Sequence, residues 1–429
     1  MGRKVVVLGS GARQAAIAWK LAQAKNVSRV IMIPGSIVPI EGVENMAIPL
    51  DKLGDILDFC QKNDVSYVMT GDGEMLSKGV VNFFQSHDVP VFGPSKKAAQ
   101  LESSKTFAKE FMNRHGIPTV SFSSFDSYEE AKEHIESRQE GPLVVKADGL
   151  VRGRGVSVCQ TKEEGLVALS DMMSNDLHGE AGRNVVIEDF ISGPEISLHI
   201  LTDTKTYRLF PFAQDHKPLK EGNVGPNTGG MGTYAPVDWI SKELEDEITQ
   251  KIILPTLRGM KADGIDYTGL LFPGLMLTPR GPMVLEYNTR FGAPETQSFM
   301  MLFDGDLDEL LYATITKKLS SVELQWKQGY AATVEVVSGQ YPEELDSTKT
   351  KITLDKSVFD GQYFLSGALL EEDQLFAVGG KIVSVSAFGK TLDEALEKAY
   401  VGVNGVNFEG MNFRKDIGRL ENKVIRIKE

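Results

Sequence analysis

Residues 4–14 read KVVVLGSGARQ, and this stretch decides how the first part of the chain folds. Its β-branched run, residues 4–8, predicts a buried strand, and Gly9 and Gly11 predict a tight turn after it. Beyond the turn, apolar residues recur at helical spacing, at Ala15, Ile17, Ala18 and Leu21. A strand, a glycine turn and a helix in this order begin a doubly wound, Rossmann-like α/β unit.

The same alternation continues to the end of an N-terminal domain that we place at residues 1–102. Strands are expected at 29–33, 66–70 and 90–92, with helices at 52–62 and 77–87 between them. Strands joined by helices pair in parallel through right-handed crossovers, so this domain is expected to hold a parallel sheet.

Residues 103–325 predict a larger α+β domain with a small strand-rich flap at about 120–192. A helix at 103–115 opens it, with Ser103 or Ser104 as the N-cap and Gly116 as the stop signal. Further strands are expected at 143–147, 156–159, 185–189, 196–201, 207–213, 270–277 and 283–288, and further helices at 162–175 and 241–262.

Residues 326–429 predict a strand-rich C-terminal α+β domain. Its strands are expected at 331–337, 381–387 and 423–427, with a helix at 392–403. The fold class is therefore multidomain, α/β in the N-terminal part and α+β in the rest.

Composition narrows the function classes. The 429 residues carry a net charge of -13, which argues against general nucleic-acid binding. Nowhere do about 18 uninterrupted apolar residues occur, so we expect no membrane span. The two cysteines, Cys60 and Cys159, lack metal-ligand spacing and are expected to be buried thiols. Such sparse cysteine is typical of the reducing cytoplasm.

The first glycine turn is a candidate phosphate site. Gly9 and Gly11 present backbone N–H groups at a helix start to a phosphate, and both, with Arg13, are candidate substrate-binding residues. A dinucleotide fingerprint wants glycine or alanine where Gln14 stands, and no acidic residue about 20 positions on suits a ribose. A nicotinamide-dependent oxidoreductase is therefore disfavoured, while a plain strand-to-helix turn stays open.

Basic residues and glycines suggest a site for nucleotide phosphates. Lys146 ends an apolar strand, where an unpaired charge would be costly, and Lys105 stands early in a helix. The turn 149–156 carries three glycines and two arginines, among them Gly153, Arg154 and Gly155. Glycines let backbone approach an anion and arginines grip phosphate oxygens, which favours a lid over a triphosphate. An exposed strand-end lysine and a flexible basic hairpin are the alternatives.

Residues 185–191 predict a strand that runs into a short linker. Such a segment offers backbone groups to an adenine edge and apolar side chains to its faces. Glu195, just beyond it, can accept hydrogen bonds from ribose hydroxyls. An edge strand with solvated acids is the alternative.

The stretch 286–290, EYNTR, is the most informative for chemistry. Alternate residues of a strand share a face, so Glu286, Asn288 and Arg290 are expected side by side. A carboxylate and an amide oxygen suit Mg²⁺, and Arg290 can hold a carboxylate or a developing phosphoryl charge. The polar outer face of an antiparallel strand is the alternative.

The loop 225–232, GPNTGGMG, has four glycines in eight residues, which no core strand or helix would choose. It predicts backbone shaped around a ligand. Asp215, His216 and Lys217 lie just upstream and add titratable groups, although a single histidine such as His216 is more often structural.

At these residues the chain resembles the phosphoribosylamine–glycine ligase family, which belongs to the ATP-grasp ligases. The similarity runs nearly end to end and rests on several motifs together. They are residues 92–119, VVKADGL and GRGV within 144–156, VIEDFISGPEIS at 186–197, QDHK at 214–217, GPNTGGMGTYAP at 225–236 and LEYNTRFGAPETQ at 285–297.

The resemblance implies an N domain, an ATP-grasp core with a flap, and a C domain. It implies ATP phosphate contacts from Lys105, Lys146 and the 153–155 turn, adenine contacts near Glu188, Asp189 and Ile191, and a ribose contact from Glu195. Glu286 and Asn288 match Mg²⁺ ligands, with Mn²⁺ as an alternative ion. Asp215 and Arg290 match catalytic positions, and the implied substrate contacts are Lys217, Asn227, Thr228, Gly229 and Gly230.

The implied reaction joins glycine to phosphoribosylamine through an acyl phosphate. The implied partners are therefore small molecules, an amino acid and a phosphorylated amine, and the protein is expected to be a monomer or weak homodimer. Three family motifs of the N domain depart here: GSGGREHA reads GSGARQAA at 9–16, GNPGT reads GSIVP at 35–39 and GPEAPL reads GDGEML at 71–76. FGDPE reads FGAPE at 291–295, with Ala293 in place of an acid. These changes keep two alternatives open: a paralogous ligase for another amine or amino acid, and a homologue that binds ATP without turnover.

Overall fold

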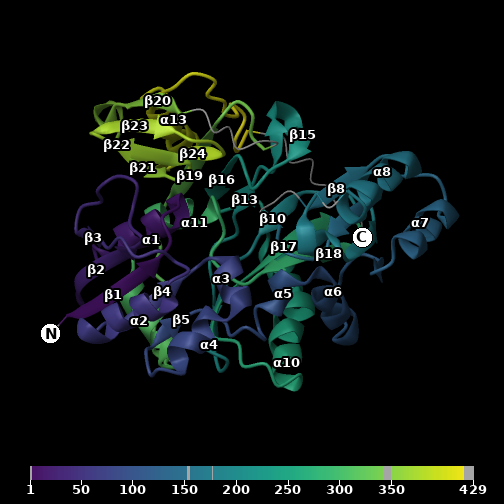
Figure 1. The fold of residues 1–429 in the computed structure, drawn as a ribbon, viewed down its shortest axis with the longest axis horizontal. Helices are drawn as coiled ribbons and strands as arrows, with labels where there is room; N and C mark the ends of the chain where they lie inside the picture. Colours follow the sequence, from purple (N-terminus) through teal and green to yellow (C-terminus); the bar gives the residue numbers. More distant parts are fainter. Residues whose placement is uncertain (1, 152–154, 176, 343–348, 420–429) are drawn as a thin grey trace.

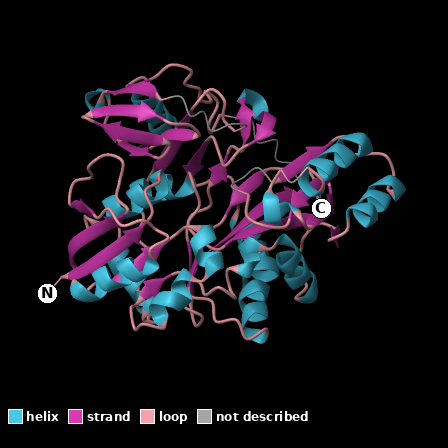
Figure 2. Ribbon diagram, in the orientation of Figure 1, coloured by secondary structure: helices cyan, strands magenta, loops and turns pink. Residues whose placement is uncertain are grey.

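The computed structural model describes residues 2–151, 155–175, 177–342 and 349–419. Three lobes surround the central β17–β18 hairpin: the N-terminal sheet, the sheet flanked by α7 and α8, and the C-terminal sheets (Figure 1). Strands gather into these separate sheets with helices packed around them (Figure 2). Among the described residues, no helix is long and apolar enough to cross a membrane.

The N-terminal sheet is parallel, in the order β3-β2-β1-β4-β5, as the alternating pattern predicts. Its strands are β1 (Arg3–Leu8), β2 (Val27–Ile33), β3 (Val43–Asn45), β4 (Tyr67–Thr70) and β5 (Val91–Phe92), and its first helices are α1 (Ala12–Leu21) and α2 (Leu53–Lys62). The β1 side chains from Val5 to Leu8 are at most 1% exposed, because helices cover both faces of a parallel sheet.

The single helix expected at 77–87 is wrong. The chain forms two short helices instead, α3 (Gly73–Lys78) and α4 (Val80–Gln85). The Asp72 side chain caps α3 by accepting from two backbone amides, and Gly79, at φ 89°, ends it in the left-handed region. A glycine at such an angle is a stop signal, so the helix begins earlier and breaks in the middle.

The flap region forms a sheet of its own, in the order β6-β9-β7-β8. Its elements are β6 (Phe122–Phe125), α7 (Tyr128–Ser137), β7 (Leu143–Ala147), β8 (Val156–Cys159), α8 (Lys162–Met173) and β9 (Val185–Asp189). A small core between the sheet and the two helices includes Leu143, Val145 and Ile187. Cys159 also lies in this core, and Cys60 lies in an N-terminal core, so the expectation of two buried thiols is confirmed.

The central sheet is built on the hairpin of β17 (Gly269–Thr278) and β18 (Gly281–Asn288). The strands expected at 196–201 and 207–213 are shorter and more broken than the pattern indicates. They form β10 (Glu195–Ser197), β11 (Ile200–Thr202) and β12 (Tyr207–Leu209). β10 and β11 both pair with β17, and Leu198 and His199 between them are not part of either ladder. The apolar run therefore forms two short strands instead of one.

The helix expected at 241–262 is continuous but changes pitch. It consists of α9 (Lys242–Ile248), a π-helical turn (Thr249–Ile253) and α10 (Leu254–Ala262). Pro255 has no N–H to donate and would clash with a carbonyl of the preceding α-helical turn, and the wider turn before it accommodates the ring. Helices α5 (Gln100–Ser103) and α6 (Lys105–Arg114) lead into this domain, and α11 (Glu295–Leu302) and α12 (Leu307–Ile315) lead out of it.

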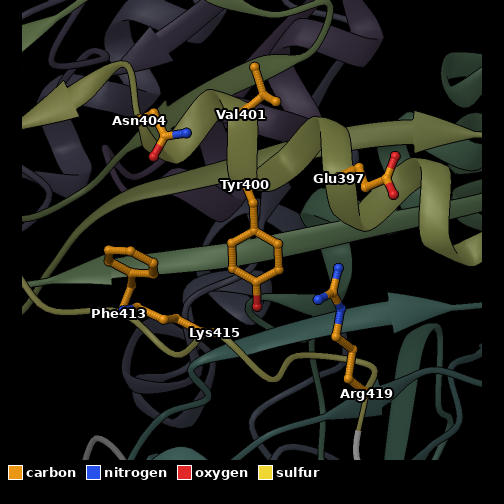
Figure 3. A pocket seen from close by; sticks show the side chains of 7 residues that line it. All are labelled: Glu397, Tyr400, Val401, Asn404, Phe413, Lys415 and Arg419. Carbon is orange, nitrogen blue, oxygen red and sulfur yellow. The ribbon is translucent and has the colours of Figure 1, made fainter.

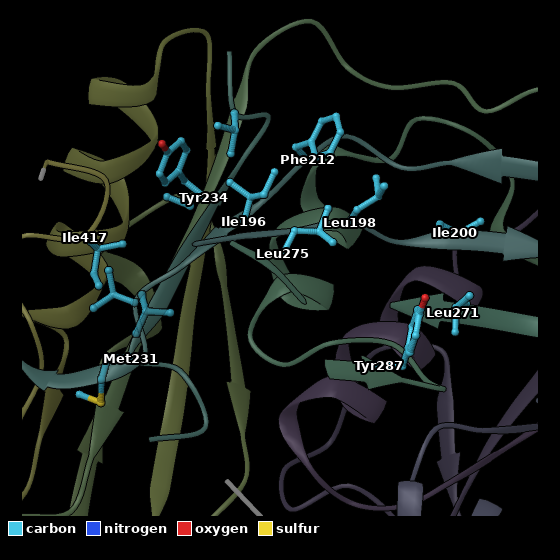
Figure 4. Close-up of a cluster of buried hydrophobic side chains, with 14 of the residues drawn as sticks. Ile196, Leu198, Ile200, Phe212, Met231, Tyr234, Leu271, Leu275, Tyr287 and Ile417 are labelled. Atoms are coloured by element: carbon cyan, nitrogen blue, oxygen red, sulfur yellow. The ribbon is translucent and has the colours of Figure 1, made fainter. Parts of the chain in front are cut away.

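The C-terminal sheet joins two parts of the chain, in the order β13-β16-β19-β24-β21. β13 (Gln214–Asp215) and β16 (Gly232–Ala235) flank the glycine-rich loop, and β19 (Tyr330–Val337), β21 (Gln362–Leu365) and β24 (Lys381–Gly389) come from the C-terminal part. The largest core cluster spans both, from Ile196 and Leu275 to Met231 and Ile417 (Figure 4).

Besides short 3-10 turns, the remaining elements of the described residues are β14 (Pro218–Lys220), β15 (Val224–Asn227), β20 (Thr350–Leu354), β22 (Ala368–Glu371), β23 (Gln374–Ala377), α13 (Leu392–Val403) and β25 (Val406–Asn407). The strands expected at 331–337 and 381–387 and the helix at 392–403 are confirmed. The strand expected at 423–427 lies outside the described residues.

Candidate active site

Lys105 is the first residue of α6, and the cap before it fixes its place. The Ser104 hydroxyl accepts a hydrogen bond from the Phe107 amide at 3.1 Å, which confirms one of the two expected N-caps. The Lys105 ammonium donates to the Gly149 carbonyl at 3.1 Å, at the turn assigned to phosphates. Burial lowers the pKa of Lys105, with Glu286 acting against it, so an anionic ligand would favour the charged form.

Lys146, on β7, is only 5% exposed, so the alternative of an exposed strand-end lysine is wrong. Its ammonium lies 2.8 Å from one carboxylate oxygen of Glu188, and Lys109 of α6 lies 2.9 Å from the other. Burial works to raise the pKa of Glu188, but the two lysines hold it below its usual value. We call Lys109, Glu188 and Lys146 the lysine–glutamate triad; it is buried and carries one net positive charge when all three groups are ionised.

Lys109 is a site residue that the sequence pattern does not reveal. Burial, and then Lys146, lowers the pKa of Lys109 to about 8. Its ammonium also donates to the Thr119 hydroxyl at 2.8 Å. The one signal available is a lysine beside Ala108, on a helix face that is otherwise buried and apolar.

The segment expected to hold adenine follows β9. That strand runs inside its sheet, between β6 and β7, so the alternative of an edge strand with solvated acids is wrong. Because the Glu188 carboxylate faces two lysines, the backbone beyond it is what can meet a base. Asp189 is paired with Arg138 at 2.6 Å, and Ile191 is half-buried beside the exposed Phe190.

Glu286, Asn288 and Arg290 share one face, as the strand period predicts. Tyr287 and Thr289, which alternate with them, are buried. Arg290 donates to the Asn288 amide oxygen at 3.2 Å, so the two side chains meet directly. Burial works to raise the pKa of Glu286, yet the surrounding cations, led by Lys217 and Lys146, lower it to about 2. Glu286 is therefore an ionised carboxylate next to an amide oxygen.

Lys217 connects the glutamates expected at the ribose and at the metal. Its ammonium forms a short ion pair with Glu195 and lies 3.6 Å from Glu286. Burial works to lower the pKa of Lys217, but Glu195 and Glu286 outweigh it and raise the pKa well above the ordinary value. The structure thus brings together three residues that are far apart in sequence.

Arg13 of the N-terminal domain reaches the same region. Its guanidinium donates to the Phe291 carbonyl at 3.1 Å, and Arg290 donates to the same oxygen at 3.2 Å. Glu102 accepts from Arg290 at 2.9 Å. Burial, and then Arg290, lowers the pKa of Arg13 to about 9, and the buried Nε of Arg13 has no hydrogen-bond partner among the described residues. Two guanidinium groups with a free donor form a site suited to an anion.

The glycine-rich loop packs against Asp215. The Thr228 amide and hydroxyl both donate to the Lys217 carbonyl, at 2.9 and 2.7 Å. Gly230, at φ 95°, lies so close that an added Cβ would be 2.5 Å from the Asp215 carboxylate. Burial, and then Glu295, raises the pKa of Asp215 well above its ordinary value. Asn227 is half-buried and Gly229 is exposed on the same loop.

His216 has a structural role, the more frequent one for a single histidine. It is 3% exposed, its Nδ1 lies 3.1 Å from the Gly232 carbonyl, and its Nε2 accepts from the Gly418 amide at 3.0 Å. Burial, and then Arg414, lowers the pKa of His216 to about 4. The ring is therefore neutral and joins the loop to the C-terminal segment.

The first glycine turn is more closed than its sequence suggests. Gly9 has φ 118°, and an added Cβ would lie 2.9 Å from the Gln14 side chain. Gln14, which stands where a dinucleotide fingerprint has glycine or alanine, therefore packs against the turn. Gly11 also lies against Gln14, whose Oε1 would be 3.3 Å from a Cβ there. Gly153 and Arg154 lie outside the described residues, while Gly155 accepts from the Ala147 amide at 2.8 Å.

Two other features lie apart from these residues. Within the described part of the chain, no group of three or more His, Cys, Asp or Glu side chains could hold a metal. A surface pocket on the C-terminal part involves none of the candidate residues (Figure 3). Its lining comprises Glu397, Tyr400, Val401, Asn404, Phe413, Lys415 and Arg419.

Comparison with known families covers nearly the whole chain. Three phosphoribosylglycinamide synthetase models match: the N domain at residues 3–102, the ATP-grasp (A) domain at 103–296 and the C domain at 331–420. The chain belongs to the phosphoribosylglycinamide synthetase family. This finding confirms the resemblance and the multidomain fold class that the sequence predicts.

Relatives of the phosphoribosylglycinamide synthetase family match over nearly the whole of this chain. The phosphoribosylamine–glycine ligase of Chlorobaculum tepidum is 41% identical, over 97% of this chain and 99% of its own length. A human trifunctional purine biosynthetic protein, adenosine-3, is 40% identical over 97% of this chain, which spans 42% of that protein. The crystal structure of phosphoribosylamine–glycine ligase from Thermotoga maritima has a TM-score of 0.81 at 31% identity, covering 96% of this chain and all of that one.

A more distant structure shares the fold alone. The biotin carboxylase domain of Hydrogenobacter thermophilus 2-oxoglutarate carboxylase, solved with MgADP and bicarbonate, has a TM-score of 0.72 at 16% identity. The match covers 96% of this chain and 92% of that domain.

Proposed function

We propose that this chain is the ATP-dependent ligase that joins glycine to 5-phosphoribosylamine. The products are glycinamide ribonucleotide, ADP and phosphate, a step of purine biosynthesis. One observation carries the proposal: Lys217 lies 3.6 Å from Glu286, and Lys217, Lys146 and Lys105 together lower its pKa, in a chain whose N, ATP-grasp and C domains all match phosphoribosylglycinamide synthetase.

The nucleotide would lie between the flap sheet and the central hairpin. Lys105 and Lys146 would face its phosphates. The backbone at 189–191 would face adenine. Glu195 would accept from the ribose hydroxyls while its carboxylate stays paired with Lys217.

Glu286 and Asn288 fit a hard divalent cation. A carboxylate ionised down to about pH 2 and an amide oxygen are ligands that Mg²⁺ accepts, and phosphate and water oxygens would complete its octahedron. Mn²⁺ takes the same ligand types, so we propose Mg²⁺ as the working ion and Mn²⁺ as a substitute. When bound, the ion would neutralise charge on the phosphates during transfer.

The chemistry needs no nucleophile from the protein. A glycine carboxylate oxygen attacks the γ-phosphorus, the bond to the ADP oxygen breaks, and an acyl phosphate forms. The amine nitrogen of phosphoribosylamine then attacks the acyl carbon, phosphate leaves, and the nitrogen loses a proton. Arg290 would stabilise the charge that develops at the phosphoryl group, and Asp215 would orient the amino acid. The flap would exclude water, which would otherwise hydrolyse the acyl phosphate.

We assign Gly9, Gly11 and Arg13 to the phosphorylated amine, because Arg13 reaches Phe291 beside Arg290. One observation favours the alternative of a different amine. In the 35–39 loop the Ser36 hydroxyl already donates to the Val38 carbonyl at 2.7 Å, and its amide donates to Asn45 at 2.9 Å. These donors are occupied inside the loop and so are not directed at a phosphate.

The working form that we propose is a cytoplasmic monomer or weak homodimer. Two free, buried thiols and a net charge of -13 support a reducing compartment and small-molecule partners. We propose no nucleic-acid or membrane partner.

The test is ADP release by the purified protein, with glycine and freshly generated phosphoribosylamine, followed by a screen of other amino acids and amines. Glycine-dependent and amine-dependent ADP release supports the proposal. ADP release with another amine alone selects the paralogue alternative. Bound ATP without turnover in any mixture selects the inactive homologue.

A further inference from the structure

The backbone N–H and C=O of Gly229, in the glycine-rich loop, both bond to side chains from the C-terminal part of the chain. The Gly229 amide donates to the Tyr341 hydroxyl at 3.0 Å. The Lys381 ammonium donates to the Gly229 carbonyl at 2.5 Å. Residues 112 and 152 positions away therefore hold the two peptide groups on either side of the exposed Gly229.

Lys381 also connects the loop to the segment that precedes α11. Its ammonium donates to the Ala293 carbonyl at 3.5 Å, so one side chain joins Gly229 and Ala293. The Lys381 side chain is 18% exposed, and its nearest carboxylate, Glu335, lies 3.9 Å away and is almost fully buried. A hydrogen bond from a charged donor in such surroundings is stronger than one in water.

At Gly230, the loop is packed closely against Asp215 and Pro294. A Cβ on Gly230 would lie 2.5 Å from Asp215 and 2.7 Å from Pro294, and the Gly230 amide donates to the Thr228 hydroxyl at 3.0 Å. The loop is thus confined between Asp215 and Pro294 on one side and Tyr341 and Lys381 on the other.

Strand pairing connects Lys381 to the strands on both sides of the loop. Lys381 begins β24, which pairs with β19, and β19 pairs with β16, the strand that directly follows the loop. β13, which contains Asp215, pairs with β16 in turn. In Figure 1, β19 and β24 lie in the C-terminal lobe, and β16 and β13 follow them toward the central hairpin. Lys381 and the strands on both sides of the loop therefore belong to one sheet, and Tyr341 lies in the turn that follows β19.

We propose that Lys381 and Tyr341 are positioning residues for the amino-acid substrate. They hold Gly229 so that the loop backbone and Asp215 keep the geometry that binds this substrate, and they make the C-terminal domain part of its site. This inference rests on the proposed function. It differs from that function in placing specificity on residues outside the ATP-grasp domain.

The test compares Lys381→Met, Lys381→Arg and Tyr341→Phe with two matched controls. Lys351→Met removes an exposed lysine of the same domain, and Tyr363→Phe removes a hydroxyl that bonds the Asp355 and Gly402 carbonyls instead. The measurements are kcat and KM for glycine, the Kd of Mg-ATP by calorimetry, and hydrogen exchange of a peptide spanning 225–235.

We expect Lys381→Met to raise the KM for glycine about 10-fold or more, and Tyr341→Phe about 5-fold. Exchange of the loop should quicken in both, Lys381→Arg should recover part of the loss, and the Kd of Mg-ATP should stay within about 2-fold. Control variants should match the wild type. An unchanged glycine KM, unchanged loop exchange, or an equal loss of Mg-ATP binding would overturn the proposal. A wild type inactive with glycine would instead reject the proposed function, and loop exchange would still decide whether the clamp exists.

Discussion

Arg13 and Arg290, which come from different domains, donate to one shared acceptor, the carbonyl oxygen of Phe291, at 3.1 and 3.2 Å. Two guanidinium groups at such proximity repel each other, and Arg290 contributes to the lowered pKa of Arg13. A bound anion would relieve this repulsion, which is why we place an anionic substrate group here.

Replacing Arg13 should therefore affect the acceptor and not the nucleotide. In Arg13→Met we expect the KM for the phosphorylated amine to rise about 100-fold, as for the loss of a charge-assisted contact. The Kd of Mg-ATP should stay near the wild-type value. Steady-state kinetics and calorimetry measure the two quantities, and Arg183→Met, an exposed arginine, is the control. Equal losses for both ligands would contradict the assignment.

Lys109 should matter for stability and for ATP. Lys109→Met leaves Glu188 and Lys146 as a neutral pair but takes the cation from one oxygen of the buried Glu188 carboxylate, so it should lower the free energy of unfolding by about 1–3 kcal/mol. Glu188 would then hold Lys146 alone, so the Kd of Mg-ATP should rise. Denaturant melts and calorimetry test both effects, with the exposed Lys62→Met as control. A variant as stable as the wild type would refute this role.

Lys109 should also make the free energy of unfolding depend on pH, in a direction that its lowered pKa determines. Its folded pKa, about 8, lies below the ordinary 10.5, so between these values the unfolded chain binds more protons at this site. The contribution of Lys109 to the free energy of unfolding therefore rises with pH across about 8 to 10.5. Wild type and Lys109→Met should differ in slope only in this window, and parallel pH curves there would contradict the prediction.

Glu286 should be essential for metal-dependent turnover. Glu286→Gln removes the charged ligand, and we expect ADP release to fall at least about 100-fold at saturating Mg²⁺. Because Glu286 has a pKa of about 2, its charge should impose no acid limb on Mg-ATP binding above about pH 4. Glu243→Gln, on the exposed face of α9, is the control. Full activity in Glu286→Gln would exclude the proposed metal site.

Gly222 and Gly230 allow the cost of a positive φ angle to be distinguished from the cost of a steric clash. Gly222 has φ 73° with no atom within 4 Å of an added Cβ, so Gly222→Ala should cost about 1 kcal/mol of unfolding free energy. Gly230 has φ 95° and would also clash with Asp215 and Pro294, so Gly230→Ala should cost about 3 kcal/mol or more. Denaturant melts measure both. Equal costs would show that the loop is not packed as described.

Local patterns predict the strands well because side-chain alternation and β-branched runs mark them directly. β7, β8 and β9 match their expected bounds, and the shared face of Glu286 and Asn288 follows from the strand period. The helix at 77–87 fails because Gly79 breaks it after an earlier start at Gly73. The π-helical turn before Pro255 is too short to leave a distinct pattern of apolar residues in the sequence, so it could not be predicted.

Long-range contacts could not be predicted from the sequence. Glu102 accepts from the Thr289 amide, 187 positions away, and Lys381 reaches Gly229 across 152 positions. Lys109 lies in a motif that the sequence singles out, but its burial beside Glu188 depends on how α6 packs on β9. Such residues are positioned by tertiary packing, which cannot be predicted from residue spacing along the chain.

The central claim is that the chain uses ATP to activate a carboxyl group, and oxygen transfer tests it most directly. Glycine labelled with ¹⁸O in its carboxylate is incubated with the protein, Mg-ATP and freshly generated phosphoribosylamine, and the released phosphate is examined by mass spectrometry. One ¹⁸O atom in each phosphate is the result we predict, because the attacking oxygen stays with phosphorus when the acyl phosphate is cleaved. Amide formation with unlabelled phosphate would contradict the account.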